Sequence, residues 1–402
     1  MGTNGSEHPK LRPLDIRPVV HEGQPLLLLR DPLELSGKAV FIPREVAPIL
    51  ALCDGTRDVA GLAAAVSIRY GWQLPLYLLT DLVEALDDAL LLDNERYAQA
   101  RAAAVSEFRS EPFRQPSLAG LSYPAEPEEL RALLHGFEQE AGAAPAAPGV
   151  RGLISPHIDY ERGGAVYARV WAEAAEAVRA ADLVILLGTD HHGGEGEVTL
   201  TRQSYATPFG VLPTCTTVVD ALAAAIGEDA LFAGELFHRD EHSIELAAVW
   251  LHYIRGGEPC EVLPVLCGPL RHRQEGGEAS VIPRFLEVVA ESTRDRQVVV
   301  VAAADLAHVG PAFGGAPLDA LGKERLRSAD DALLAHVCAG DAEGFLEAIE
   351  RCENANNVCG VSSIYLALRL LGETAGERVA YAVCPADEAD TSVVTIGGVL
   401  LW

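Results

Sequence analysis

The sequence predicts an α/β fold with a mostly parallel central sheet flanked by helices, preceded by a small helical domain that carries a β-ribbon. From residue 150 onward, continuous apolar segments alternate with helical segments, as in a parallel sheet that helices cover on both faces. Between residues 18 and 95, two short strand-like segments precede three amphipathic helical segments. A chain of 402 residues with 49% hydrophobic residues is long enough for two or three domains.

The overall charge limits the classes of partner. Lys and Arg number 31 and Asp and Glu number 58, so the formal net charge is −27. A surface of this sign repels nucleic acid and anionic membranes, and we expect neither as a partner. The eight cysteines form no CxxC pair, and no apolar run is long enough for a membrane span or a signal peptide. We therefore expect a soluble, cytoplasmic protein with reduced thiols.

The N-terminal part is predicted to contain an arm and a separate domain. Residues 1–17 are polar and contain proline, and we expect a loose arm. In the domain, residues 18–95, strands are predicted at residues 25–30 and 38–42, with turn signals at Asp31-Pro32 and Ser36-Gly37 between them. Helices are predicted at residues 44–53, 58–70 and 76–89, where apolar residues recur at helical spacing.

Three motifs of this domain, CDGTRDVAGLAA, YGW and VEALDDALLLDN, occur in an order that resembles the PqqD-like winged-helix domains. The resemblance implies a winged-helix-like fold that binds the leader segment of a ribosomally made peptide. The predicted helices contain few basic residues, so we expect a peptide or protein partner and no affinity for DNA. A purely structural appendage is the alternative.

Residues 96–149 are predicted to be a linker and a helix. A charged helical segment leads into a Pro- and Ser-containing stretch, and the X-Pro steps in residues 123–127 set the start of the next helix. The low-complexity residues 141–148 are expected to be a flexible connector. In the α/β domain, residues 150–402, strands are predicted at 151–155, 183–188, 261–266 and 297–303, and helices at 165–179, 243–254, 282–292 and 361–371.

Polar side chains gather where the predicted strands end. Four segments contain five of the twelve histidines, and they are residues 155–160 (SPHIDY), 188–194 (GTDHHGG), 240–245 (DEHSIE) and 305–310 (DLAHVG). Ligands of an open α/β sheet bind outside the carboxyl ends of its strands, so we expect these histidines to converge. Imidazole suits iron, copper and zinc, and the joint pattern predicts a metal site. A single histidine after a strand would more often be only a hydrogen-bonding residue.

The geometry of strands and helices narrows the candidates. Adjacent residues leaving a strand point to opposite sides, so only one of His191 and His192 is expected to be a ligand. His242 and Glu245 lie one turn apart on the same face of a predicted helix. The acidic residues at this helix start are equally consistent with ordinary N-terminal capping.

The same segments, with YATPFG and NNVCGVSSIYLAL, occur in the order and spacing of the Memo-like family, also called AmmeMemoRadiSam system protein B. The resemblance covers about residues 123–402. It implies a fold similar to that of class III extradiol ring-cleaving dioxygenases, with a mononuclear iron site. The implied metal ligands are His157, His191 and Cys359.

The resemblance also assigns His242, Asp305 and His308 as acid/base or supporting groups. Ferrous iron is the expected metal, with copper or zinc as alternatives. Without the resemblance, Cys359 would be interpreted as a small buried hydrophobic residue. Its position just before a predicted helix favours a ligand, because a helix N-terminus lowers the pKa of a thiol.

The chain departs from the family at one motif. Many members carry PHAGY followed by a Ser-Gly pair, whereas this chain has Ile158-Asp159 and then residues 162–164 (RGG) in those places. Asp159 adds a carboxylate close to His157 in the sequence. This carboxylate could change the preferred metal or substrate.

Three functions are consistent with these motifs. The first is a non-heme iron redox enzyme acting on an unknown small substrate, because two histidines and one anionic ligand are similar to the facial triad of iron oxygenases. The second is a non-catalytic module that binds a peptide or protein, with a structural or vestigial metal site. The third is a zinc-type hydrolase in which His242 or Glu245 is the base, although the ligands have no zinc-hydrolase spacing.

Overall fold

The computed structural model describes residues 8–142, 144–194, 196–270 and 280–402. The chain divides into two compact units, of which the first ends at Ser110 and the second begins at Glu111. Residues 1–7 of the predicted arm and residue 143 of the predicted connector lie outside the described residues. Residues 111–149, predicted as part of a linker and helix, belong to the same unit as the α/β sheet.

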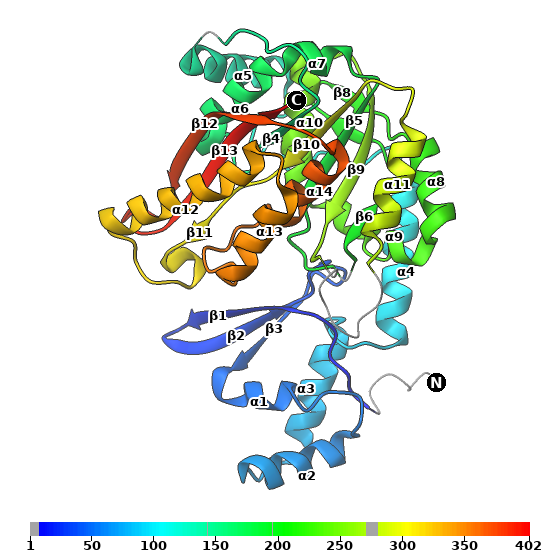
Figure 1. Ribbon diagram of the computed structural model, residues 1–402. Coiled ribbons are helices and arrows are strands. Elements are labelled where there is room, and N and C mark those ends of the chain that lie inside the picture. Colours follow the sequence, from blue (N-terminus) through cyan, green and yellow to red (C-terminus); the bar gives the residue numbers. More distant parts are fainter. Residues whose placement is uncertain (1–7, 143, 195, 271–279) are drawn as a thin grey trace. The chain divides into compact units, whose positions relative to one another are not determined.

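The first unit combines a small antiparallel sheet with helices (Figure 1). The sheet order is β1 (Asp15–His21), β2 (Gln24–Arg30) and β3 (Ala39–Pro43). The short elements η1 (Arg44–Val46) and α1 (Ala47–Leu50) are followed by α2 (Val59–Tyr70), α3 (Leu76–Asp88) and α4 (Glu95–Ser110). The sequence does not predict β1, because most of its side chains are exposed and it shows no apolar alternation.

Local signals explain why α2 forms where it does. The Asp58 carboxylate accepts a hydrogen bond of 2.7 Å from the backbone nitrogen of Gly61, which caps the helix start. Gly71 ends the helix in the left-handed region, at φ 72°. Leu62 and Val66 of α2 pack with Leu79 and Val83 of α3 in the apolar core of the unit.

The second unit is built on a mixed sheet. In the described part of the chain, eight strands form this sheet, in the order β11-β13-β4-β10-β5-β9-β6, with β12 paired to β13. The four central strands, β4, β10, β5 and β9, are parallel, and the outer strands are antiparallel. The strand bounds are β4 (Gly152–Ser155), β5 (Leu183–Thr189), β6 (Val198–Leu200), β9 (Glu261–Cys267), β10 (Val298–Ala303), β11 (His308–Val309), β12 (Gly376–Pro385) and β13 (Val393–Leu401). The expectation of a mostly parallel central sheet is therefore confirmed.

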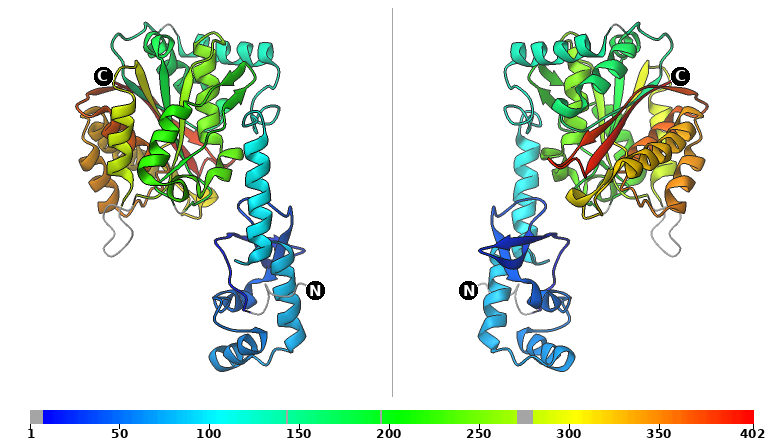
Figure 2. Two further views of the ribbon diagram at one scale, coloured as in Figure 1. Left: turned by 90° about the vertical axis from the view of Figure 1, so that its right-hand side faces the viewer. Right: turned by 90° about the vertical axis from the view of Figure 1, so that its left-hand side faces the viewer.

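Helices cover both faces of this sheet (Figure 2). Alternate residues of β5 belong to opposite cores: Ile185 packs with the helices of one face, and Leu186 packs with those of the other. The first face carries α8 (Thr216–Ile226), α11 (Ile282–Ser292), α12 (Ala320–Cys338), α13 (Ala342–Arg351) and α14 (Val361–Leu371). The second face carries α5 (Pro127–Ala141), α6 (Tyr160–Glu173), α7 (Ala175–Ala180) and α10 (His242–Ile254). The unit also contains a hairpin, β7 (Tyr205–Thr207) and β8 (Gly210–Leu212), the helix α9 (Glu228–Phe232), and the 3-10 helices η2 (Glu235–Arg239) and η3 (Pro311–Phe313).

The parallel strands place the candidate residues at one edge. The segments that carry His157, His191 and Asp305 directly follow β4, β5 and β10, so all three leave the sheet at its carboxyl edge. No helix among the described residues has both the length and the apolar character that a membrane span requires.

Candidate metal centre

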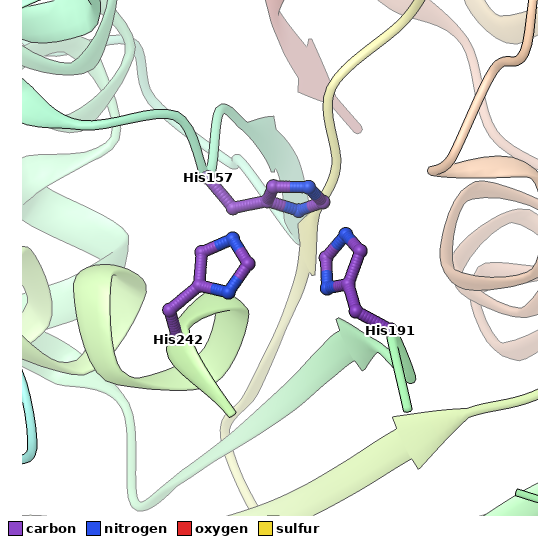
Figure 3. A group of neighbouring side chains, drawn as sticks. All are labelled: His157, His191 and His242. Carbon is purple, nitrogen blue, oxygen red and sulfur yellow. The ribbon is translucent and has the colours of Figure 1, made fainter. Parts of the chain in front are cut away.

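Three histidines from different parts of the chain converge at the carboxyl edge of the sheet. His157 follows β4, His191 follows β5, and His242 is the first residue of α10 (Figure 3). One ring nitrogen from each lies within 4.8 Å of the others. His157 is buried, whereas His191 and His242 remain partly exposed, which leaves a solvent-facing side to the group. The three histidines are far apart in the sequence and meet only in the folded sheet.

Hydrogen bonds fix which nitrogen each imidazole presents. The Nδ1 of His157 donates to the carbonyl oxygen of Ala303 at 2.8 Å. The Nδ1 atoms of His191 and His242 lie 3.0 and 3.1 Å from the same Glu241 carboxylate oxygen. A carbonyl or carboxylate oxygen only accepts, so these Nδ1 atoms carry hydrogens and the Nε2 atoms carry the lone pairs. This pattern is typical of histidines that bind a metal through Nε2.

Glu241 holds two of these imidazoles, those of His191 and His242, in place through its carboxylate. Its buried carboxylate also accepts hydrogen bonds from the backbone nitrogens of Ser243 at 2.9 Å and His191 at 3.1 Å. Burial alone would raise the pKa of Glu241, but its hydrogen bonds with histidines hold that pKa well below the usual range. The sequence indicates only a helix cap at this position. Glu241 does cap α10, and the same carboxylate orients His191 and His242.

Cys359 lies beside His157, just before α14. Its Sγ is 3.2 Å from Nε2 of His157 and 3.7 Å from the carbonyl oxygen of Asp305. Burial, together with the charge of Asp305, raises the pKa of Cys359 well above its usual value. The direction is opposite to the one expected from the helix N-terminus, because removal of the thiolate from water outweighs the helix dipole. A thiolate at this position therefore requires a cation to stabilise it.

Asp305 lies on the loop that follows β10, and His308 begins β11. Asp305 accepts hydrogen bonds from the backbone nitrogens of His157 at 2.8 Å and Ile158 at 3.2 Å, and so holds the loop that carries His157. Burial raises the pKa of Asp305. The Nδ1 of His308 lies 3.2 Å from the carbonyl oxygen of Leu306, and burial lowers the pKa of His308. Burial therefore favours the neutral form of the His308 imidazole.

Three polar residues singled out in the sequence have other partners. His192 stacks on Phe237, with ring centroids 5.3 Å apart, and its Nδ1 lies 3.6 Å from a carboxylate oxygen of Glu241, but its ring is not part of the histidine group. The Asp159 carboxylate caps α6 and forms an ion pair with Arg162, so these partners and not His157 occupy its oxygens. Glu245 is buried and accepts hydrogen bonds from the 111–123 segment.

A cavity borders the site on the side of Cys359. It has a volume of about 430 Å³, and half of its ten lining residues have branched aliphatic side chains. The aliphatic ones are Leu270, Leu346, Ile349, Val358 and Val361. A cavity of this size accommodates a small molecule with an apolar body.

The donor set fits a first-row transition metal. Imidazole nitrogens with a thiol alongside suit iron, copper or zinc, whereas magnesium and calcium prefer oxygen ligands. The structure thus supports a metal site of three histidines, and the donor chemistry does not by itself select one of the three metals.

Residues 114–399 match the family model described as Memo-like protein. The chain belongs to the Memo-like family. Among its relatives, a MEMO1 family protein of Thermus thermophilus is 33% identical over 316 residues, which cover 78% of this chain and 90% of that protein. A MEMO1 family protein of Methanopyrus kandleri is 30% identical over 296 residues, covering 70% and 95%. One of Aquifex aeolicus is 27% identical over 307 residues, covering 76% and 77%. The family resemblance seen in the motifs is confirmed.

Proposed function

We propose that this Memo-like chain is a non-heme iron enzyme that carries out redox chemistry on a small substrate. The observation that carries the proposal is the convergence of His157, His191 and His242, whose ligand atoms lie within 4.8 Å of one another. Two of them take their orientation from one buried carboxylate, as metal-binding histidines commonly do. We further propose that the sheet and its edge site follow the plan of class III extradiol dioxygenases.

The proposed ligands come from two overlapping sets. The family resemblance implies His157, His191 and Cys359, and the geometric group contains His157, His191 and His242. We propose that both His242 and Cys359 serve the same ion, since Cys359 Sγ is 3.2 Å from His157 Nε2. When bound, ferrous iron would supply a centre for oxygen-dependent redox chemistry.

The other residues would act around the ion. Glu241 orients His191 and His242, and Asp305 holds the backbone of His157. His308, whose Nδ1 lies 3.2 Å from the carbonyl oxygen of Leu306, is proposed as the group that accepts a proton from the substrate. The aliphatic cavity next to Cys359 would hold the body of that substrate.

The zinc-hydrolase alternative finds less support. One of its two candidate bases, Glu245, is fully buried, and Arg114, Ser117 and Tyr123 occupy its carboxylate oxygens. A general base must reach a metal-bound water, and Glu245 points to a different part of the unit.

Metal analysis of the anaerobically purified chain tests the proposal. We expect about one iron per chain, and oxygen uptake once a substrate is found. His157→Ala and His191→Ala should abolish iron retention, and Cys359→Ser and His242→Ala should weaken it. His135→Ala is a matched control, since His135 is an exposed histidine paired with Glu138. Zinc retained in place of iron would contradict the proposal, whereas retained iron without oxygen-dependent turnover would favour the non-catalytic module.

We also propose that the first unit is a winged-helix-like module that binds an extended peptide. Within the described residues β1 pairs only with β2, so its outer edge leaves backbone groups for an added strand. Ile16 and Val20 of β1 are 48% and 76% exposed. A displayed peptide library should contain peptides that bind the full chain. The Val20→Lys substitution in β1 should abolish this binding, and the control substitution Ile68→Lys, on α2, should leave it unchanged. Salt-sensitive binding of duplex DNA by the chain would contradict this assignment.

A further inference from the structure

We propose that Arg114 is a positioning residue of the metal centre. It lies outside the histidine group, and it holds the chain segment that carries Glu241 and His242. The inference rests on the proposed metal binding and adds a residue that no motif of the sequence indicates.

The buried guanidinium of Arg114 contacts three residues of that segment. Its Nε donates to the carbonyl oxygen of His238 at 2.9 Å, and its Nη2 donates to the carbonyl oxygen of Glu241 at 2.9 Å. Its Nη1 forms an ion pair with Glu245. The three partners run from η2 to the first turn of α10, so the guanidinium fixes the main chain at the point where the helix begins.

The main chain of Arg114 is itself fixed. Its nitrogen donates to the carbonyl oxygen of Ser204 at 2.8 Å, and its own carbonyl oxygen accepts from Ala206 at 3.0 Å. The guanidinium also lies 5.1 Å from the Tyr205 ring. Arg114 therefore reaches the α10 segment from a backbone that is hydrogen-bonded to the β7 region, independently of its side chain.

Glu241 transmits this restraint to the site. The guanidinium of Arg114 donates to the main-chain carbonyl oxygen of Glu241. The side-chain carboxylate of Glu241 accepts from Nδ1 of His191 and of His242. A shift of the Glu241 main chain would move the carboxylate and, with it, the Nε2 atoms of two imidazoles. Because affinity and geometry at a metal depend on ligand placement to about half an ångström, loss of the restraint should weaken and distort metal binding.

The residue type matters as well as the charge. A guanidinium donates in several fixed directions within one plane, which suits two carbonyl oxygens and a carboxylate. A lysine ammonium keeps the positive charge beside Glu245 but is shorter and lacks the planar fork. The Arg114→Lys variant therefore tests the positioning of the α10 segment while the positive charge beside Glu245 is kept.

Cobalt(II) titration of the metal-free chain tests the role. Its absorption spectrum reports the geometry and the donors of the bound ion, without any need for a substrate. We expect Arg114→Lys to weaken cobalt affinity about tenfold or more and to change the absorption bands, as removal of a group that orients a ligand does. Glu241→Gln should produce a change of the same kind.

Arg296→Gln is the matched control. Arg296 also makes three contacts, with Glu261, Asp182 and Cys215, but it does so beside the amino ends of β5 and β9, at the opposite edge of the sheet. The Arg296→Gln variant should have the cobalt affinity and the absorption spectrum of the unmodified chain. This should hold even if its midpoint of thermal unfolding falls by as much as that of Arg114→Lys. Equal affinity and spectrum in Arg114→Lys and the unmodified chain would overturn the inference.

A second, milder substitution tests the inference even if Arg114→Lys does not fold. Ser117 hydroxyl contacts both Arg114, at 3.3 Å, and Glu245, at 3.0 Å. Ser117→Ala should lower cobalt affinity about threefold, and an unchanged value would also overturn the inference. If the unmodified chain binds no metal ion at all, the proposed function fails instead, so the two failures are distinguishable.

Discussion

His191 and His192 are adjacent just after β5, yet their rings have different neighbours. His191 belongs to the histidine group, and His192 stacks on Phe237. We expect His191→Ala to reduce metal affinity about a hundredfold or more, since it removes a ligand, and His192→Ala to change it by less than about tenfold. Competition with a chromogenic chelator measures both values. The opposite ranking would show that the two residues have exchanged roles.

A buried histidine away from the ligands should control stability in acid. His238 accepts from Tyr205 and donates to the carbonyl oxygen of Thr199, and burial lowers its pKa from the usual 6.5 to about 3. Between these two pH values the unfolded chain binds a proton that the folded chain does not. The stabilisation that neutral His238 provides is thus complete above about pH 6.5 and declines as the pH falls toward 3.

His238→Gln keeps one donor and one acceptor but does not titrate. Between pH 6 and 4.5 the free energy of unfolding of the unmodified chain should fall more steeply than that of the variant, by up to about 1.4 kcal/mol per pH unit. Urea unfolding at a series of pH values measures this difference. Above pH 7.5 the two slopes should coincide, and identical slopes at acid pH would contradict the assignment.

At the scale of elements, the site depends on how closely α10 approaches the end of β5. A Cβ atom on Gly188 would lie 2.5 Å from Ile244 and 2.6 Å from Ser243 of α10. Ser243 also donates from its hydroxyl to the carbonyl oxygen of Thr189 at 3.1 Å. The absence of a side chain at Gly188 therefore lets the first turn of α10 bring His242 toward His191.

Gly188→Ala should separate these two elements. We expect a loss of about 1–3 kcal/mol in the free energy of unfolding, as for other overpacked sites, together with weaker metal binding. Gly136→Ala is the control, because a Cβ at Gly136, within α5, would meet no atom within 4 Å. That substitution should stabilise the chain by up to about 1 kcal/mol and leave metal affinity unchanged. Normal metal binding in Gly188→Ala would show that close approach of α10 is dispensable.

At the scale of the whole molecule, the position of the domain boundary is open to a direct test. The sequence predicts an α/β domain from residue 150, whereas the compact unit of the structure begins at Glu111. Residues 111–149 contribute Arg114, Ser117 and Tyr123 to the buried carboxylate of Glu245. Leaving that carboxylate without partners would be strongly destabilising, by about 3–5 kcal/mol.

A pair of truncated chains decides between the two boundaries. A chain of residues 111–402 should fold cooperatively and retain the metal, and a chain of residues 150–402 should be far less stable or insoluble. Circular dichroism during thermal unfolding and metal content measure both outcomes. Equal stability of the two chains would favour the boundary at residue 150.

The sequence by itself determined the central parallel strands and the positions where chemistry gathers. Apolar periodicity predicts β4, β5, β9 and β10, because burial on both faces leaves a continuous apolar run, and it predicts the helices α6, α10, α11 and α14. The runs of β4, β5 and β10 lead into SPHIDY, GTDHHGG and DLAHVG, so the amino-acid order alone places histidines at the strand ends. The antiparallel strands β12 and β13 are not predicted, since they form a hairpin outside the alternation of strands and helices that marks the parallel sheet.

Only the tertiary structure decided which side chains act together. The three partners of Arg114 on the α10 segment lie 124 to 131 residues away, and Glu241 meets His191 across 50 residues, so no local pattern could pair them. Cys359 likewise meets His157 across 202 residues, and its raised pKa follows from burial that no helix position reveals. Sequence periodicity reports which face of an element is buried. The contacts between elements depend on how the sheet twists and how closely the helices approach it, and those follow from the packing of the whole unit.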